Sequence, residues 1–228
     1  MLILAFRLGL RRNEILGLSK SDWHELDCLL VRDNHARTLK SKNSKRKGPF
    51  ALLTPSEQEL IIEFFKSDHP YPFFPGKTCP THQDLDNHPA IRLVNNTLKR
   101  AVMGRNVHPH NLRHSTASWA IFGMFAADVG YETFPIPTAW MDAAIARAEI
   151  LTNTLTSPFK RHAARGTAVS VLLGHGTDTM TYQHYVHVLD LLLHIACTPE
   201  NGLGCSEERK LRDLSLIHIS EPTRPLYI

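Results

Sequence analysis

Apolar positions recur with a helical period over most of the chain. They run through "LILAFRLGL" and resume in "NEILGL", so residues 1–18 are predicted to be helical with a break at Gly9. The segment "TPSEQELIIEFFK" is predicted to begin a helix at Pro55, because Thr54 can cap it and Glu57 completes a capping box. Helical spacing returns in "AIRLVNNTLKRAV" and in "MDAAIARAEIL".

Short β-like runs lie between the first helices, near residues 28–32, 38–40 and 50–53. The polar and strongly basic stretch "KSKNSKRKG" separates the last two runs and is predicted to form a hairpin tip. Residues 68–89 are rich in Pro, His and Asp, which predicts a long loop. The elements are therefore mostly helical, with a few short strands near the start.

Composition narrows the class of protein. The chain has 228 residues, of which 43% are hydrophobic, enough for one domain with a core. Its net charge of +4 and pI near 8.9 favour a polyanionic partner. The 4 cysteines show no CxxC spacing, which argues against a disulfide framework or a zinc site and favours a reducing cytosol. No apolar run reaches the roughly 18 residues that a membrane span needs.

The two ends of the sequence are unusual. The chain begins inside a helical pattern without a cap, and we expect it to be truncated there. The stretch "LSLIHISEPTR" matches one reading frame of an adapter used in transposase-based sequencing libraries. Residues 214–228 are therefore interpreted as an artefactual tail, which leaves residues 1–213 as the domain.

The segment "HPHNLRH" carries the first candidate chemistry. In a helix that begins after Pro109, the side chains of His110, Arg113 and His114 share one face. A zinc site is disfavoured, because the arginine would repel a cation and no third ligand is evident. Arginine beside histidine suits an oxyanion better, since a guanidinium offers a fork of donors to a phosphate. A basic, solvated helix start remains the alternative.

Three further stretches accompany this motif. "GLRRNEILGL" places Arg11 beside the glycine break and before Glu14, and "LLGHGTDTMTYQHYVH" places His175 after a glycine and before Tyr185. "LKSKNSKRKGPFALL" places lysines on the predicted hairpin tip. In this order, over residues 1 to about 190, the motifs resemble those of the tyrosine recombinase (phage integrase) family. That family carries GLRxxE, a hairpin lysine, HxLRH, LGH, and then a tyrosine nine or ten residues on.

The resemblance implies a mainly α fold with a small antiparallel β-sheet (α+β). It implies metal-free DNA strand cleavage and rejoining through a 3′-phosphotyrosyl intermediate, by a site-specific recombinase or integrase that needs no cofactor. The implied partners are double-stranded DNA and further copies of the chain, as a tetramer on DNA, with no membrane. The expected location is the bacterial cytoplasm, on the nucleoid when DNA is bound.

The resemblance also assigns roles to residues of this sequence. Tyr185 would attack phosphorus, while Arg11 and Arg113 would clamp the phosphate and stabilise its growing charge. His110 would take the tyrosine proton, and His175 would donate a hydrogen bond to the phosphate. Because a tyrosine has a pKa near 10, it needs such a base and cationic field in order to attack.

A hairpin lysine would protonate the leaving 5′-oxygen, and the pattern places it at Lys40, with Lys42 as the alternative. The remaining basic residues of the tip, Lys45, Arg46 and Lys47, are predicted to contact DNA phosphates, and so is Lys42 if it is not the acid. The alternative is that these residues only form a solvated tip.

Several neighbours of these residues have open roles. Tyr182 lies one helical turn before Tyr185 and is the rival nucleophile, although the ending "YVH" favours Tyr185. Glu14 is expected to support the helix or orient Arg11, and His114 to support the site. The histidines that flank the tyrosine, His184 and His187, are expected to orient it or to lie on the surface.

The sequence departs from the family pattern in its spacing and its extent. Residues 124–165 are predicted to be an insertion, and the amino-terminal DNA-clamping domain of the family is missing from this sequence. Two other functions stay open: a catalytically inactive DNA-binding remnant of a mobile element, and a histidine-rich metal protein.

Overall fold

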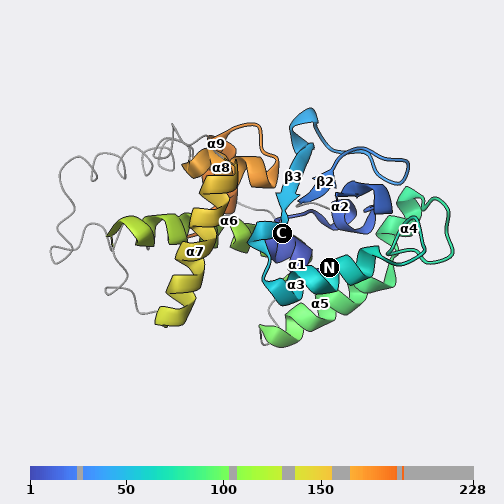
Figure 1. Cartoon of the computed structure of the whole chain (residues 1–228), viewed down its shortest axis with the longest axis horizontal. Coiled ribbons are helices and arrows are strands. Elements are labelled where there is room, and N and C mark those ends of the chain that lie inside the picture. The colour runs from blue at the N-terminus through green and yellow to red at the C-terminus, as the bar shows by residue number, and fades with distance from the viewer. Residues whose placement is uncertain (25–27, 103–106, 130–136, 156–164, 189–191, 193–228) are drawn as a thin grey trace, which may run out of the picture.

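The computed structural model describes residues 1–24, 28–102, 107–129, 137–155, 165–188 and 192. Most of these residues are helical (Figure 1). The α-helices are α1 (Leu2–Arg7), α2 (Arg12–Leu16), α3 (Pro55–Phe65), α4 (His82–Asp86), α5 (Pro89–Ala101), α6 (Pro109–Val129), α7 (Thr138–Leu155), α8 (Arg165–Leu173) and α9 (Asp178–Tyr185). An antiparallel sheet has the strand order β1 (Trp23–His24), β2 (Cys28–Val31) and β3 (Arg46–Pro49). The predicted mostly helical chain with a small antiparallel sheet is confirmed.

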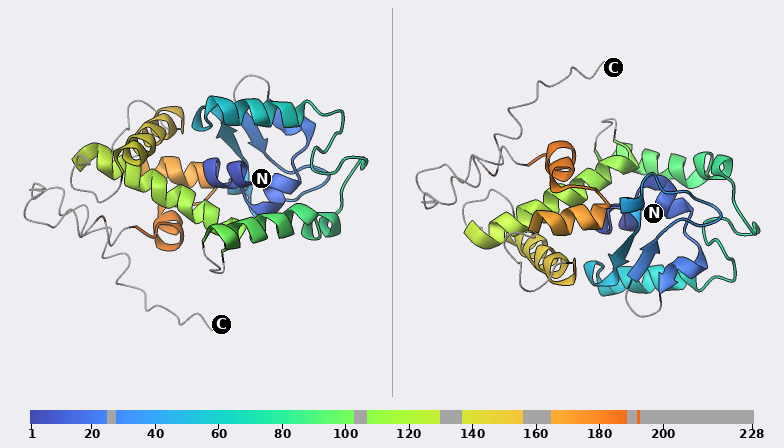
Figure 2. Two further views of the ribbon diagram at one scale, coloured as in Figure 1. Left: turned by 90° about the horizontal axis from the view of Figure 1, so that it is seen from below. Right: turned by 90° about the horizontal axis from the view of Figure 1, so that it is seen from above.

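Helix α6 organises one end of the molecule, where it contacts α1, α7, α8 and α9. The sheet lies at the other end with α2, and Figure 2 shows α3 and α5 on opposite sides of the strands. The main hydrophobic core joins the two ends, because it contains Leu8 just after α1, Leu29 of β2, Ala117 of α6 and Leu173 of α8, all with no exposed surface. No helix of the described residues is long and apolar enough to cross a membrane.

The predicted helix break at Gly9 is confirmed. Helix α1 ends at Arg7 and α2 begins at Arg12, and Gly9 between them has φ +59°. A side chain at Gly9 would be strained by this positive φ, and its methyl group would stand 2.5 Å from Cδ2 of Leu173, so glycine lets the segment lie against α8. This close approach brings Arg11 next to the end of α8.

The predicted start of α3 is confirmed by its cap. The backbone nitrogen of Thr54 donates to Glu57 Oε2 at 2.8 Å, and the backbone nitrogen of Glu57 donates to the threonine hydroxyl at 3.4 Å. Pro55 occupies the first turn, where its missing N–H costs no hydrogen bond.

The strand predictions were only partly right. The run at 28–32 is confirmed as β2, but 38–40 is not a strand, and the strand predicted at 50–53 lies instead at Arg46–Pro49. A turn at Lys42–Ser44 precedes β3, and a 3₁₀ turn at Phe50–Leu52 follows it. The sequence "RKGP" offers no apolar alternation, so the hydrophobic pattern could not place this strand.

The predicted loop at 68–89 contains a short helix, α4. Thr81 caps it, because the threonine hydroxyl accepts from the backbone nitrogen of Asp84 and the aspartate accepts from that of Thr81. This reciprocal cap is the signal that the prediction missed. Leu85 of α4 is buried in a second, smaller core cluster.

The segment predicted as an insertion, 124–165, holds a helix that belongs to the main core. Met141 and Leu151 of α7 are almost fully buried in the same cluster as α1 and α6. Arg147 of α7 donates to the carbonyl oxygens of Phe6 and Arg7, at 2.9 and 2.6 Å. Two parts of the segment, 130–136 and 156–164, lie outside the described residues, as does the predicted tail at 214–228.

Candidate functional site

The predicted catalytic residues meet where α2, α6, α8 and α9 approach one another beside β3. Tyr185 ends α9, and its ring centroid lies 4.3 Å from that of His175 and 5.7 Å from that of His110. The guanidinium carbon of Arg113 lies 5.3 Å from the same ring. Residues from α6 and from the turn after α8 therefore surround one phenol.

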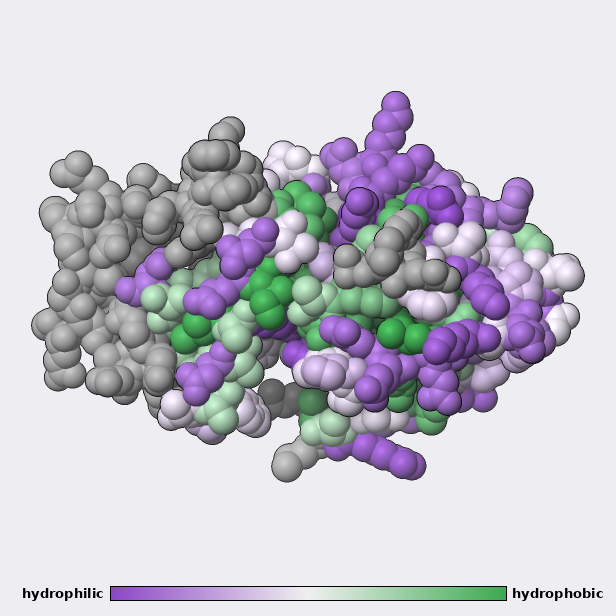
Figure 3. Space-filling view, viewed as in Figure 1, coloured by the Kyte–Doolittle hydropathy of each residue, from purple (hydrophilic) through white to green (hydrophobic). Residues whose placement is uncertain are grey.

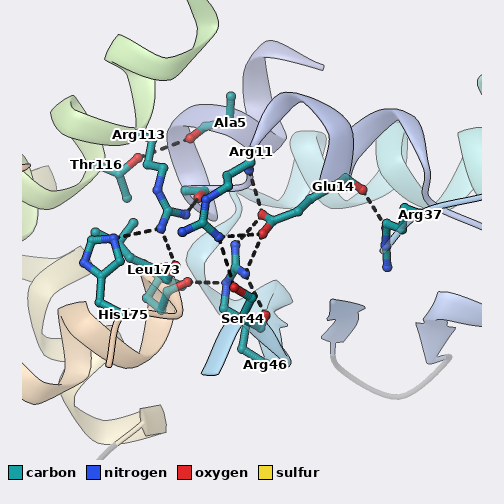
Figure 4. A network of polar contacts seen from close by, with 12 residues as sticks. Ala5, Arg11, Glu14, Arg37, Ser44, Arg46, Arg113, Thr116, Leu173 and His175 are labelled. Atoms are coloured by element: carbon teal, nitrogen blue, oxygen red, sulfur yellow. Dashed lines mark hydrogen bonds and ion pairs between the residues drawn. The ribbon is translucent and has the colours of Figure 1, made fainter. Parts of the chain in front are cut away.

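Arg113 lies at the centre of this arrangement and has no exposed surface. Its guanidinium donates to the carbonyl oxygens of Gly9 and Leu173, and Nη2 lies 2.9 Å from Nε2 of His175 (Figure 4). Burial, and then the positive charge of Arg11, lower the pKa of Arg113, but a guanidinium still keeps its proton at neutral pH. The site thus holds a fixed positive charge.

Arg11 stands at the start of α2, and Glu14 orients it. The glutamate accepts from the backbone nitrogen of Arg11 at 2.7 Å and from its Nη1 at 2.8 Å. The same Nη1 lies 3.4 Å from the hydroxyl of Ser44. The side chain of Arg11 remains 25% exposed, so it can still reach an anion that enters from solvent.

Arg46 does not lie on a solvated tip, and that prediction was wrong. Its side chain is 3% exposed, with Nη2 2.7 Å from Glu14 Oε2 and Nε 2.7 Å from the carbonyl oxygen of Leu172. Burial alone would raise the pKa of Glu14, but the charge and hydrogen bond of Arg46 lower it to about 2. Glu14 is therefore a carboxylate that pairs with two arginines, and Arg46 ties β3 to the end of α8.

His175 follows the turn that ends α8. Gly174 adopts φ +65°, and a side chain there would crowd Arg46 and the backbone of Asn43 at 3.1 Å. The imidazole of His175 bonds on both sides, with Nε2 2.9 Å from Arg113 and Nδ1 2.8 Å from the hydroxyl of Thr181. Burial, and then the charge of Arg113, lower its pKa to about 3, so the ring is neutral near pH 7.

One face of α6 holds the end of α9 through residues four positions apart, His110, His114 and Ser118. The hydroxyl of Ser118 donates to the carbonyl oxygen of Tyr185 at 3.3 Å and accepts from the backbone nitrogen of His187 at 3.0 Å. Nδ1 of His114 lies 3.0 Å from Nε2 of His187. These contacts fix the backbone around Tyr185. The sequence patterns did not predict this role for Ser118.

A cavity of about 480 Å³ opens beside this cluster, and its lining includes Arg11, Lys40 and His110. Partial burial, and then the charge of Arg113, lower the pKa of His110, and Lys40 contributes to the same shift. Lys40 is exposed on the segment that joins β2 to β3, where Figure 3 shows hydrophilic side chains gathered. The cavity thus joins the predicted acid to the residues around the phenol.

The other lysines of this segment are exposed to solvent. Lys42 and Lys47 are exposed, and Lys45 forms an exposed ion pair with Asp33 at 3.0 Å. Lys42 does not line the cavity that Lys40 lines. The geometry therefore separates Lys40 from the rest of the predicted basic tip.

Tyr182, the rival nucleophile, is packed against the main core. A methyl group at Gly166 would stand 2.6 Å from its hydroxyl, which places that hydroxyl against the start of α8. Burial, and then the charge of Asp178, raise the pKa of Tyr182 to about 12. Tyr182 is therefore harder to ionise than an ordinary tyrosine.

The site has the chemistry of an anion-binding site with a phenol at its centre. Two guanidinium groups and neutral imidazoles can bind an oxyanion and can accept or donate protons beside it. Within the described residues, no three His, Cys, Asp or Glu side chains are grouped so that they could hold a metal ion. In comparisons with known proteins, no family model, no curated protein and no solved structure matches this chain.

Proposed function

We propose that the chain is the catalytic domain of a site-specific DNA recombinase or integrase of the tyrosine recombinase family. It would cleave and rejoin DNA strands through a 3′-phosphotyrosyl intermediate. The observation that carries this proposal is the environment of Tyr185, whose ring lies 4.3 Å from His175, 5.7 Å from His110 and 5.3 Å from the Arg113 guanidinium carbon. Two stretches of sequence that lie about 60 residues apart, "HPHNLRH" and "LLGHGTDTMTYQHYVH", supply these side chains.

The proposed reaction begins with attack of the Tyr185 oxygen on phosphorus. His110 accepts the phenolic proton, and it is suited to do so because partial burial and neighbouring positive charges lower its pKa and keep it neutral. The bond from phosphorus to the 5′-oxygen breaks, and Lys40 gives that oxygen a proton. The products are a 3′-phosphotyrosyl bond and a 5′-hydroxyl, and attack by another 5′-hydroxyl reverses each step without ATP.

Arg11 and Arg113 would stabilise the charge that grows on the phosphate oxygens. The two side chains differ in their access to an incoming phosphate. Arg11 is 25% exposed, whereas the Arg113 guanidinium donates to the carbonyl oxygens of Gly9 and Leu173. Arg11 is the guanidinium that can contact the phosphate directly. Arg113 acts mainly through its fixed charge and through its contact with His175.

Covalent trapping tests the proposal. The full chain is incubated in EDTA with random-sequence DNA duplexes that carry single nicks, so that a short 5′-hydroxyl fragment diffuses away and leaves a protein–DNA adduct. The wild type and Tyr182→Phe should form the adduct, whereas Tyr185→Phe should bind DNA without forming it. Absence of an adduct from the wild type, or its loss in Tyr182→Phe alone, contradicts the proposal.

A second candidate function is DNA binding without cleavage. It is favoured by the exposed lysines Lys40, Lys42 and Lys45 between β2 and β3 and Lys47 of β3, which form a basic surface whether or not the site is active. In the same experiment, this function predicts retention of the duplexes on a filter with no adduct for any variant.

A further inference from the structure

The two nitrogens of His175 have different partners, and the two partners together set the tautomer. Nε2 lies 2.9 Å from Nη2 of Arg113, and a guanidinium can only donate hydrogen bonds. Nε2 must therefore accept, which means that it carries no proton in the neutral ring. The ring proton of His175 is consequently on Nδ1.

The hydroxyl oxygen of Thr181 accepts the hydrogen bond that Nδ1–H of His175 donates. This oxygen lies 2.8 Å from Nδ1 of His175 and 2.7 Å from the hydroxyl of Ser170. Because Nδ1 donates to Thr181, the threonine's own hydrogen is available for Ser170. Thr181 has no exposed surface and Ser170 only 3%, so water does not compete for these groups.

We propose that Thr181, supported by Ser170, is a positioning residue that holds the His175 proton on Nδ1 and reserves Nε2 for the phosphate side of the site. This inference rests on the proposed function. In the unbound protein, Nε2 accepts from Arg113, so His175 donates to a phosphate only after a second proton reaches Nε2. Thr181 serves both states equally, because Nδ1 carries a proton in each of them.

The surroundings explain why such control is needed at His175. The groups that face it come from α6, α2, β3 and α9, namely Arg113, Arg11, Arg46, His184 and Tyr185. The three arginines oppose a second proton on the imidazole. A phosphate that enters the site brings negative charge beside them and favours that proton. With Nδ1 already occupied, the second proton can bind only at Nε2.

The test combines a direct readout of the tautomer with a rate. Imidazole ¹⁵N spectra of the free full chain near pH 7 should show the Nδ1–H tautomer for His175 in the wild type and in Thr181→Ser. Thr181→Val keeps the shape but leaves the buried Nδ1–H without an acceptor, so the imidazole should turn away from Arg113 and the share of the Nδ1–H tautomer should fall. Single-turnover cleavage of nicked DNA by this variant should fall roughly 10-fold or more, comparable with the loss of one buried hydrogen bond, and Thr181→Ser should restore the rate.

Thr152→Val is the matched control, because this buried threonine donates to the carbonyl oxygen of Ala148, one turn earlier on α7, at 2.8 Å. It should lose stability without a change in tautomer or rate. A retained Nδ1–H in Thr181→Val, or an unchanged cleavage rate in that variant, overturns the inference. If the wild type forms no adduct at all, the proposed function fails, and the spectra alone then decide whether Thr181 sets the tautomer.

Discussion

The imidazole of His114 lies face to face with the phenol ring of Tyr185, with ring centroids 4.4 Å apart and planes inclined by 16°. Burial, and then the charge of His110, lower the pKa of His114 to about 4, so its imidazole is neutral at physiological pH. The stack sets the plane of the phenol, while Ser118 holds the backbone on either side of it. Helix α6 therefore controls the orientation of the proposed nucleophile.

Loss of this stack should slow cleavage modestly. His114→Ala should lower the single-turnover rate on nicked DNA by roughly 2- to 10-fold, because a stacked aromatic pair contributes about 0.5–1.5 kcal/mol. His114→Phe keeps an aromatic ring but cannot bond to His187, and it should recover most of the rate. A phenylalanine variant as slow as the alanine variant would show that the histidine bond, and not the stack, positions Tyr185.

The buried carboxylate of Glu14 should make stability depend on acid pH. Its pKa is lowered from 4.5 to about 2 in the folded chain, so the stabilisation is present above about pH 4.5 and is lost as the pH falls towards 2. The free energy of unfolding in urea should fall by about 3 kcal/mol over this window. Glu14→Gln should remove that dependence and destabilise the chain by about 3–5 kcal/mol at pH 7, because Arg46 is left buried without its partner.

The matched control for Glu14 is Asp86→Asn. Asp86 pairs with Arg12 at 2.8 Å, but both side chains are largely exposed, so the change should cost less than about 1 kcal/mol. Equal losses for the two variants would show that the pairing of Glu14 with Arg46 is no stronger than a surface ion pair.

Lys40 should differ from Lys45 in its chemistry. Lys40→Ala should slow strand cleavage by roughly 10²- to 10⁴-fold with little change in DNA affinity, as expected for a lost general acid. A substrate with sulfur in place of the leaving 5′-oxygen needs no proton there and should restore the rate. Lys45→Ala should instead weaken binding and lower the salt slope by about one unit, with normal cleavage of bound DNA.

Lys42→Ala completes this comparison, because Lys42 is the other lysine that fits the family pattern. If the sulfur substrate restores the cleavage rate of Lys42→Ala and not that of Lys40→Ala, then Lys42 is the general acid. Rescue of neither variant would rule out both lysines as the proton donor.

Arg147 tests whether α7 is a dispensable insertion. Arg147→Met should lower the free energy of unfolding by about 2–3 kcal/mol, because hydrogen bonds from a charged donor to the carbonyl oxygens of Phe6 and Arg7 are lost. Glu149→Gln, an exposed change on the same helix, should have almost no effect. A wild-type urea midpoint for Arg147→Met would mean that α7 does not support α1.

The sequence predicted features that have a period or a fixed spacing. Apolar spacing identified α1, α2, α3, α5 and α7 in outline but missed α4, and the family motifs identified the residues that surround Tyr185. Hydroxyl groups have no such pattern, so the contacts of Ser118 and Thr181 could not be predicted. The prediction put Arg46 in a charged turn, because the sequence around β3 has no apolar alternation that would indicate a strand. The structure shows a buried arginine instead.

The bonds that hold the end of α1 join residues far apart in the chain. Thr116, Arg113 and Arg147 bind carbonyl oxygens of residues 6–9 from 104 to 141 positions later. On the ribosome, the nascent chain therefore exposes Arg11 long before the groups that fix its backbone have been made. Such contacts give a high contact order, for which slow folding is expected. The backbone beside Arg11 therefore gains these bonds only after α6 and α7 have been made and have packed against it.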